Sequence, residues 1–314
     1  SNGILATAIQ GTATISANQG SQITTEGNQA GISLSESTGA INLSGVTVSS
    51  IEGAVVEVRN INNATLSDST LTSINSSTNG ISLNGVRGTV DISNSTITIT
   101  DPLDNINGIS VSNVTGTVNI AANEGSQITQ ANQGIELSDS TGAIAISGFE
   151  IRNTDDSGIS GTDLSNVTLA NNRIEGATNQ GIFLENVNEE VNITDNIISE
   201  TIDNNTVLPL TGQGILLNNV TGRIEISTNT ISGTMGFKPD PQIPPSGQGI
   251  VINNDTGSVN ITLSNNSLFD NYEDAILIGL GVPFGDPIVN LRIEGNTIEN
   301  NGGSNPTRGD GIGI

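Results

Sequence analysis

Histidine, cysteine and tryptophan are absent from this chain of 314 residues, and each absence narrows its chemistry. Without histidine the chain lacks the side chain most often used as a general base, and Ser-His-Asp and Cys-His nucleophile systems are excluded. Without cysteine it has neither disulfide bonds nor thiolate metal sites. Catalysis would therefore depend on carboxylates, arginine, lysine or the single tyrosine, Tyr272.

Basic residues are scarce as well. Eight lysines and arginines stand against 32 acidic residues, which gives a net charge of −24. Such a charge repels phosphate backbones and anionic lipids, so nucleic acid is not expected as a partner. No apolar run approaches the ~18 residues of a membrane span, so no membrane insertion is expected in this segment. An acidic, lysine-poor composition is common among secreted bacterial surface proteins, which favours an extracellular or cell-surface location.

The pattern that is present is a repeat of Gly-Ile-x-aliphatic. Copies that match it fully are listed here by their ranges: 31–34, 80–83, 108–111, 134–137, 181–184, 214–217 and 249–252. Degenerate copies start at Gly3, Gly53, Gly158, Ala275 and Gly311. A period in the twenties without a helical 3.6-residue pattern is typical of a β-solenoid.

One repeat predicts three short strands. In GISLNGVRGTVDISNSTITIT (80–100), apolar residues alternate with polar ones in three segments. The residues expected to point inward are Ile81, Leu83, Val90, Ile92 and Ile97. Strands with a period of two, three per repeat, predict an all-β, three-sided parallel β-helix of about eleven to twelve rungs, where a rung is one complete turn of the solenoid.

The link between the second and third strands of each repeat has its own pattern. Its central position is occupied by Gly45, Asp68, Asn94, Gly148, Asn171, Asp195, Asn265 and Gly295, with Thr228 as the exception. Because Gly, Asn and Asp tolerate a left-handed backbone best, this position predicts a bend with φ > 0. The next position is asparagine in five consecutive copies, Asn172, Asn196, Asn229, Asn266 and Asn296, and predicts a hydrogen-bonded asparagine ladder.

These repeats, for instance NNRIEGATNQGIFLENVNEEVNITDNIISET (171–201), resemble the right-handed parallel β-helix repeats of the pectin-lyase-like superfamily. The resemblance extends over essentially the whole chain and implies one right-handed β-helix domain over 1–314. We also expect this domain to be a segment of a longer protein, because neither end shows a capping element. It leaves the activity open, because that superfamily includes polysaccharide lyases and hydrolases, adhesins and autotransporter passengers.

Two groups of residues are candidates for chemistry or binding. Asn-Thr-Asp-Asp (153–156) looks like the Asn-Thr-Asp element of polygalacturonases, but their Gly-His-Gly and Arg-x-Lys elements are missing. Asp155 and Asp274, in the loosely similar EDAI (273–276), are 119 residues apart in sequence. The nearest arrangement to a pectate lyase site is Arg152, Asp155 and Asp156 with Arg173 one rung on, but the favoured interpretation is that the aspartates are turn residues. No cofactor is predicted, although solvent-facing carboxylates such as Asp270, Glu273 and Asp274 could bind calcium without a catalytic role.

The second group lies in longer loops between 201 and 310. Insertions in solenoids usually project from one face, and this region contains Phe237, Lys238, Tyr272 and Phe284, whose rings could stack on sugars. The alternative is that these loops only cover a sheet edge.

Taken together, these features predict a non-catalytic stalk or adhesin segment that binds a cell-surface glycan or protein. The alternative is a polysaccharide-binding or polysaccharide-cleaving β-helix protein. Because a parallel β-helix exposes unpaired backbone groups at its ends, end-to-end self-association is also expected.

Overall fold

The computed structural model describes residues 2–17, 21–100, 102, 105–201, 212–235, 247–254, 259–280, 289–302 and 311–313. These residues form strands and turns without any helix, so none of them forms a helix long and apolar enough to cross a membrane. The chain divides into two compact units, 1–151 (unit 1) and 152–314 (unit 2). The segments 202–211, 236–246, 281–288 and 303–310, which hold most of the predicted loop insertions, lie outside the described residues.

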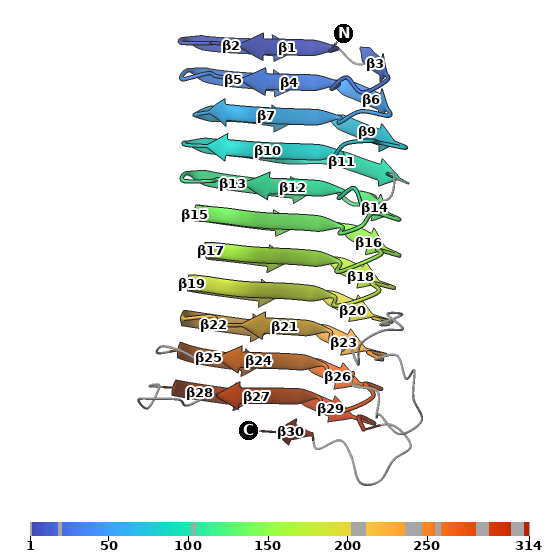
Figure 1. The fold of residues 1–314 in the computed structure, drawn as a ribbon, viewed down its shortest axis with the longest axis vertical. Coiled ribbons are helices and arrows are strands. Elements are labelled where there is room, and N and C mark those ends of the chain that lie inside the picture. Colours follow the sequence, from blue (N-terminus) through green and yellow to red (C-terminus); the bar gives the residue numbers. More distant parts are fainter. Residues whose placement is uncertain are drawn as a thin grey trace. The chain divides into compact units, whose positions relative to one another are not determined.

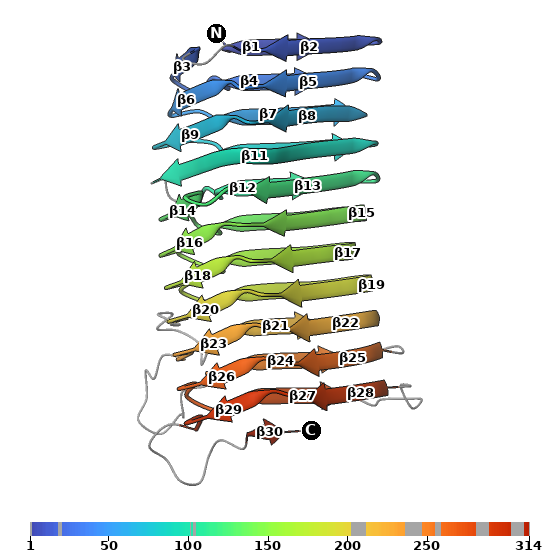
Figure 2. The same cartoon turned by 180° about the vertical axis from the view of Figure 1, so that it is seen from behind.

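Each rung of unit 1 contributes a strand to three successive faces (Figures 1 and 2). The first face contains β1 (Ile4–Thr7), β4 (Ile32–Ser35), β7 (Val56–Ile61), β10 (Ile81–Val86), β12 (Ile109–Ser112) and the start of β15 (Ile135–Ser147). The second face contains β2 (Thr12–Ser16), β5 (Ala40–Ser44), β8 (Asn63–Ser67), the start of β11 (Thr89–Thr100), β13 (Thr117–Ala122) and the end of β15. The third face contains β3 (Gln22–Glu26), β6 (Thr47–Ile51), β9 (Thr70–Ile74), the end of β11 and β14 (Gln127–Thr129).

Unit 2 repeats this plan. Its first face contains the starts of β17 (Ile159–Ala170) and β19 (Ile182–Thr194), then β21 (Ile215–Asn218), β24 (Ile250–Asn254), β27 (Ile276–Leu280) and β30 (Ile312–Gly313). The second face contains the ends of β17 and β19, then β22 (Gly222–Ser227), β25 (Val259–Ser264) and β28 (Val289–Glu294). The third face contains β18 (Arg173–Glu175), β20 (Ile197–Ser199), β23 (Thr230–Ser232), β26 (Ser267–Phe269) and β29 (Thr297–Glu299); β16 (Glu150–Arg152) crosses the boundary between the units.

Within each unit, strands on one face pair in parallel and place like residues on one another. In unit 1, Ile81 pairs with Ile109 and Ile92 with Ile120. The five residues predicted to point inward are at most 2% exposed, which confirms the predicted core. The described strands make about 10 rungs, close to the predicted number, and the repeat start at Gly311 contributes only the two-residue strand β30.

The glycine of the repeat signature is required by close packing at the start of the first face. A Cβ atom on Gly181 would overlap Cγ2 of Ile198 and lie 2.7 Å from the carbonyl oxygen of Gly214. The glycine therefore lets the third face turn tightly into the first.

The corner between the second and third faces has the predicted left-handed backbone. All nine residues at the central position, Thr228 included, have φ between 49° and 85°. The predicted asparagine ladder is also present in unit 2: Oδ1 of Asn196 accepts hydrogen bonds from the backbone N and Nδ2 of Asn172, at 2.9 and 3.1 Å. The same pair of bonds recurs at each step down to Asn296.

One core position in unit 1 is underfilled. Ala64 on β8 is 5% exposed and pairs with Ile41 and Val90, which are larger. A small void beside it is lined by Ile32, Leu34, Val56, Val58, Leu66, Val90, Asp91 and Ile92.

We expect Ala64→Val to raise the free energy of unfolding by about 1 kcal/mol, because the added methyl groups fill this void. Chemical denaturation measures the change. Ala145→Val on β15, where the side chain is only half-buried on the outer surface, controls for strand propensity. A loss of stability in Ala64→Val, or an equal gain in the control, would contradict the expectation.

Thr228 has a β-branched side chain at φ 57°, a conformation that costs such a residue about 1–2 kcal/mol. We therefore expect Thr228→Asn to raise the urea midpoint. The same substitution at Thr230, on the extended strand β23, should lower it, because asparagine is a poor strand former. Equal shifts in both variants would show that the corner conformation is not the cause.

Candidate functional site

The structure brings together the two arginines that the sequence places one rung apart. Arg152 ends β16 and Arg173 begins β18, and both guanidinium groups reach the carboxylate of Glu175. The Nη2 to Oε2 distances are 3.7 Å from Arg152 and 3.1 Å from Arg173. The arginines are therefore engaged in a shared ion pair on the outer surface. Sequence reasoning missed Glu175, although its position two residues after Arg173 on a strand puts it on the same face.

The two aspartates of this group are part of the turn that follows. Asp155 is exposed, and Asp156 is half-buried. The Asn179 amide donates to Oδ1 of Asp156 at 2.9 Å, and the Thr154 hydroxyl donates to the backbone carbonyl of Asp156 at 3.0 Å. In this arrangement Asp156 organises the turn between β16 and β17 through bonds to its neighbours.

The two carboxylates compared with polygalacturonases are far apart along the solenoid. Asp155 precedes β17 and Asp274 precedes β27, and four strand pairings separate these two strands. At ~4.8 Å for each pairing, the separation is about 19 Å. Glycosidase carboxylates that act on one bond lie about 5 to 9.5 Å apart, so Asp155 and Asp274 cannot act as such a pair.

Of the four predicted ligand-binding residues in the loops, Tyr272 is described. Its side chain is half-buried, and its backbone N donates to the Thr234 carbonyl at 3.1 Å. Phe237, Lys238 and Phe284 lie outside the described residues.

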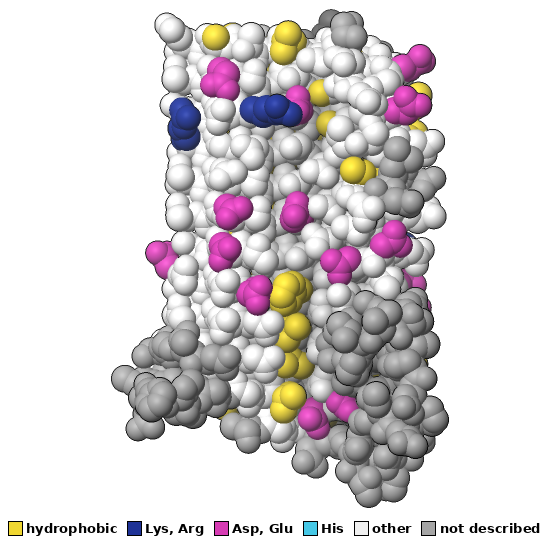
Figure 3. Space-filling view, viewed as in Figure 1, with side chains coloured by type: hydrophobic (Ala, Val, Ile, Leu, Met, Phe, Trp, Pro, Cys, Tyr) yellow, Lys and Arg dark blue, Asp and Glu magenta, His cyan; other side chains and the backbone are white. Residues whose placement is uncertain are grey.

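Sequence reasoning did not predict an apolar column on the outer surface of unit 2. It consists of Phe183, Leu216, Val251 and Leu277, which stack in register on β19, β21, β24 and β27 of the first face. Figure 3 shows a stripe of hydrophobic side chains over these strands. The signal was present in the variable letter of the signature, which changes to Phe, Leu and Val in GIFL, GILL and GIVI.

The apolar column is bordered by amide side chains. On one side stand Gln180, Gln213 and Gln248, all at most 8% exposed, with Nε2 of Gln180 3.4 Å from Oε1 of Gln213. On the other side, Nδ2 of Asn253 donates to Oδ1 of Asn218 at 3.2 Å. The surface thus combines an apolar strip with buried amides along one edge and accessible amides, Asn218 and Asn253, along the other.

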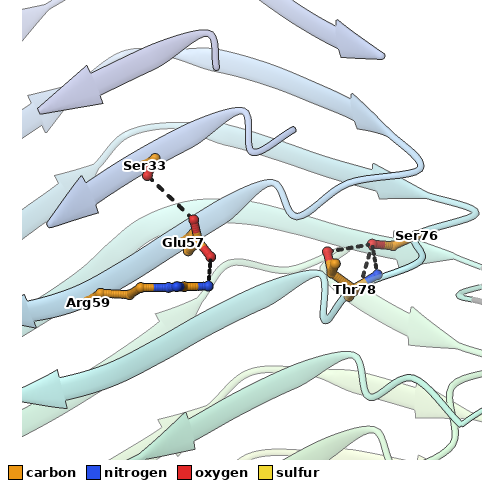
Figure 4. Close-up of polar contacts among 5 residues, drawn as sticks. All are labelled: Ser33, Glu57, Arg59, Ser76 and Thr78. Atoms are coloured by element: carbon orange, nitrogen blue, oxygen red, sulfur yellow. Dashed lines mark hydrogen bonds and ion pairs between the residues drawn. The ribbon is translucent and has the colours of Figure 1, made fainter. Parts of the chain in front are cut away.

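The same column is mostly polar in unit 1. After Leu5 on β1, it contains Ser33, Glu57, Ser82, Ser110 and Glu136. Figure 4 shows Glu57 accepting a hydrogen bond from Ser33 at 3.5 Å and pairing with Arg59 at 2.5 Å. In the same view, Ser76 and Thr78 bond to each other within one turn.

Other charged groups of unit 2 are paired in a similar way. Arg223 on β22 bridges Glu190 and Glu225, with 2.7 Å between Nη1 and Oε1 of Glu190. Hydrogen bonds from Thr228, and to a lesser degree from Thr194, lower the pKa of Asp195 below its usual range. Among the described residues, no group of three or more His, Cys, Asp or Glu could hold a metal ion.

Comparison with known proteins identifies the fold. A solved structure of a mutant of the periplasmic alginate epimerase AlgG superposes with a TM-score of 0.52 over 88% of this chain and 73% of that one, at 13% sequence identity. At that identity the likeness shows the fold alone. No curated protein matches the sequence. The family model described as a right handed beta helix region matches residues 30–201 and 79–268, which together cover 30–268 of the 314 residues. The chain therefore belongs to the right-handed β-helix family, as the repeats predicted.

Proposed function

We propose that this chain is a non-catalytic stalk or adhesin segment that acts outside the cell or at its surface. The observation that carries the proposal is the use of outward charged groups for bonding between neighbouring rungs. Arg152 pairs with Glu175 and Arg223 with Glu190 across neighbouring rungs, while Arg173–Glu175 and Arg223–Glu225 are pairs within one strand. Ion pairs between rungs connect each rung to its neighbour, as a rigid stalk requires.

A catalytic function has less support. A polysaccharide lyase or hydrolase needs an acid and a base, or a base and a cation, on either side of one bond. The shared ion pair occupies both candidate arginines, and the candidate carboxylates lie about 19 Å apart at ~4.8 Å per pairing.

We expect no turnover of polygalacturonate or alginate by the purified chain, with or without added calcium. The measurement is release of unsaturated products or reducing ends over long incubation. Turnover that is lost in both Arg152→Ala and Asp155→Ala, but retained in Arg59→Ala, would contradict the proposal, because Arg59 is an exposed arginine of unit 1 paired only locally.

The second candidate is polysaccharide binding by the outer surface of unit 2. It is favoured by the apolar column, because sugar rings present C–H faces to apolar side chains and hydroxyl groups to amides. Phe183 and Leu277, at the two ends of the column, are half-exposed, whereas Leu216 and Val251 are 9% and 3% exposed. The ends of the column are therefore the positions to test.

For this candidate we expect Phe183→Ser to weaken binding to soluble polysaccharides by about tenfold, which corresponds to the ~1.4 kcal/mol of one aromatic contact. Affinity electrophoresis against a panel of neutral and acidic polysaccharides measures it. Phe269→Ser removes the same ring from the third face, on β26, and should leave binding unchanged. Equal losses in both variants, or binding that survives in Phe183→Ser, would contradict a role for the column.

A further inference from the structure

The corner between the second and third faces is built differently in the two units. In unit 2 the buried position after the bend is asparagine. Besides its two bonds to the next asparagine, Asn196 donates through Nδ2 to the carbonyls of Leu169 and Thr194, at 2.9 and 3.0 Å. Asn229 does the same to Ile193 and Ser227. Every step of this asparagine ladder therefore joins side chain to side chain and side chain to backbone.

In unit 1 the same position is serine at Ser69 and Ser95 and apolar at Val46 and Phe149. The Ser69 hydroxyl accepts from the backbone N of Val46 at 3.3 Å and donates to the Ser67 carbonyl at 2.7 Å. Ser95 accepts from the backbone N of Ser69 at 3.2 Å in the same way. A hydroxyl has one proton to donate, and here it goes to a carbonyl of the same rung. The serine ladder therefore lacks the side-chain bonds from one rung to the next that asparagine makes.

The interior of unit 1 also differs near the third face. Strands β3, β6 and β9 of unit 1 are five residues long, whereas β14 of unit 1 and the third-face strands β18, β20, β23, β26 and β29 of unit 2 have three. The longer strands add a stacked column of Thr25, Ser50 and Ser73, all at most 5% exposed. These hydroxyls are bonded to one another or to carbonyls, so they are satisfied, but they bury less apolar surface than an aliphatic column would.

We propose that the two units unfold in stages. Unit 1 unfolds first, and the asparagine ladder stabilises unit 2, so that unit 2 unfolds only at a higher denaturant concentration. In a solenoid, stability is close to a sum of terms within rungs and between neighbouring rungs. Unit 2 has more hydrogen bonds at each corner step, and unit 1 has the hydroxyl column and the void at Ala64. This inference goes beyond the proposed function and does not depend on it.

The test uses the whole chain. Tyr272 is the only tyrosine and the chain has no tryptophan, so tyrosine fluorescence reports on unit 2, whereas far-UV circular dichroism reports on the strands of both units. In a urea titration we expect two transitions by circular dichroism, of which the second coincides with the change in tyrosine fluorescence. A single transition shared by both signals, or a fluorescence change that comes first, would overturn the proposal.

Exchange of ladder residues tests the cause. Asn229→Ser places the residue type of unit 1 in unit 2 and should lower the second midpoint alone, while Ser69→Asn with Ser95→Asn should raise the first midpoint alone. Asn192→Ser is the matched control, since Asn192 lies on the outer surface of β19, outside the ladder. If Asn229→Ser does not fold, the variant with both Ser69→Asn and Ser95→Asn still tests the proposal. An unchanged first midpoint in that variant would refute the role of the amide side chains.

Discussion

Register between neighbouring rungs is the constraint on which the rest of this structure depends. Each strand donates its backbone N–H groups to a strand one rung away, so equivalent residues are held at the spacing of about 4.8 Å. A side chain therefore meets its own counterparts along the column, as Ile81 meets Ile109. Because every rung must present the same backbone, the corner bends with φ > 0 recur at each one, even where the residue is Thr228.

The same constraint determines which polar groups can be buried. A buried side chain at a corner can only be satisfied by the rung on either side or by its own backbone. Asparagine, with a carbonyl and an NH₂ group, satisfies both neighbours and forms a continuous chain of bonds. Serine satisfies one neighbouring N–H and its own rung. Asparagine and serine thus satisfy the buried backbone groups of this corner in two different ways.

Much of the fold could be predicted because the core and the corners are tied to the backbone. Period-two alternation gave the inward residues, and the Gly, Asn or Asp at the bend gave the left-handed conformation and the asparagine ladder. Residues on the outer surface are not constrained by the backbone in this way. Arg152 and Arg173 were placed correctly one rung apart, but Glu175, which engages both, was overlooked among many acidic residues. The serine ladder was missed because serine also occupies many outward positions in these repeats.

The outward columns of such a solenoid can change residue type while the backbone stays unchanged. At one position of the first face, unit 1 carries serine and glutamate after Leu5, while unit 2 carries Phe183, Leu216, Val251 and Leu277. Both sets stack at the same spacing on the same kind of strand, so core packing does not explain the difference. Leu216 and Val251 are already buried within the chain, so only Phe183 and Leu277 at the two ends of the column leave apolar surface in contact with water.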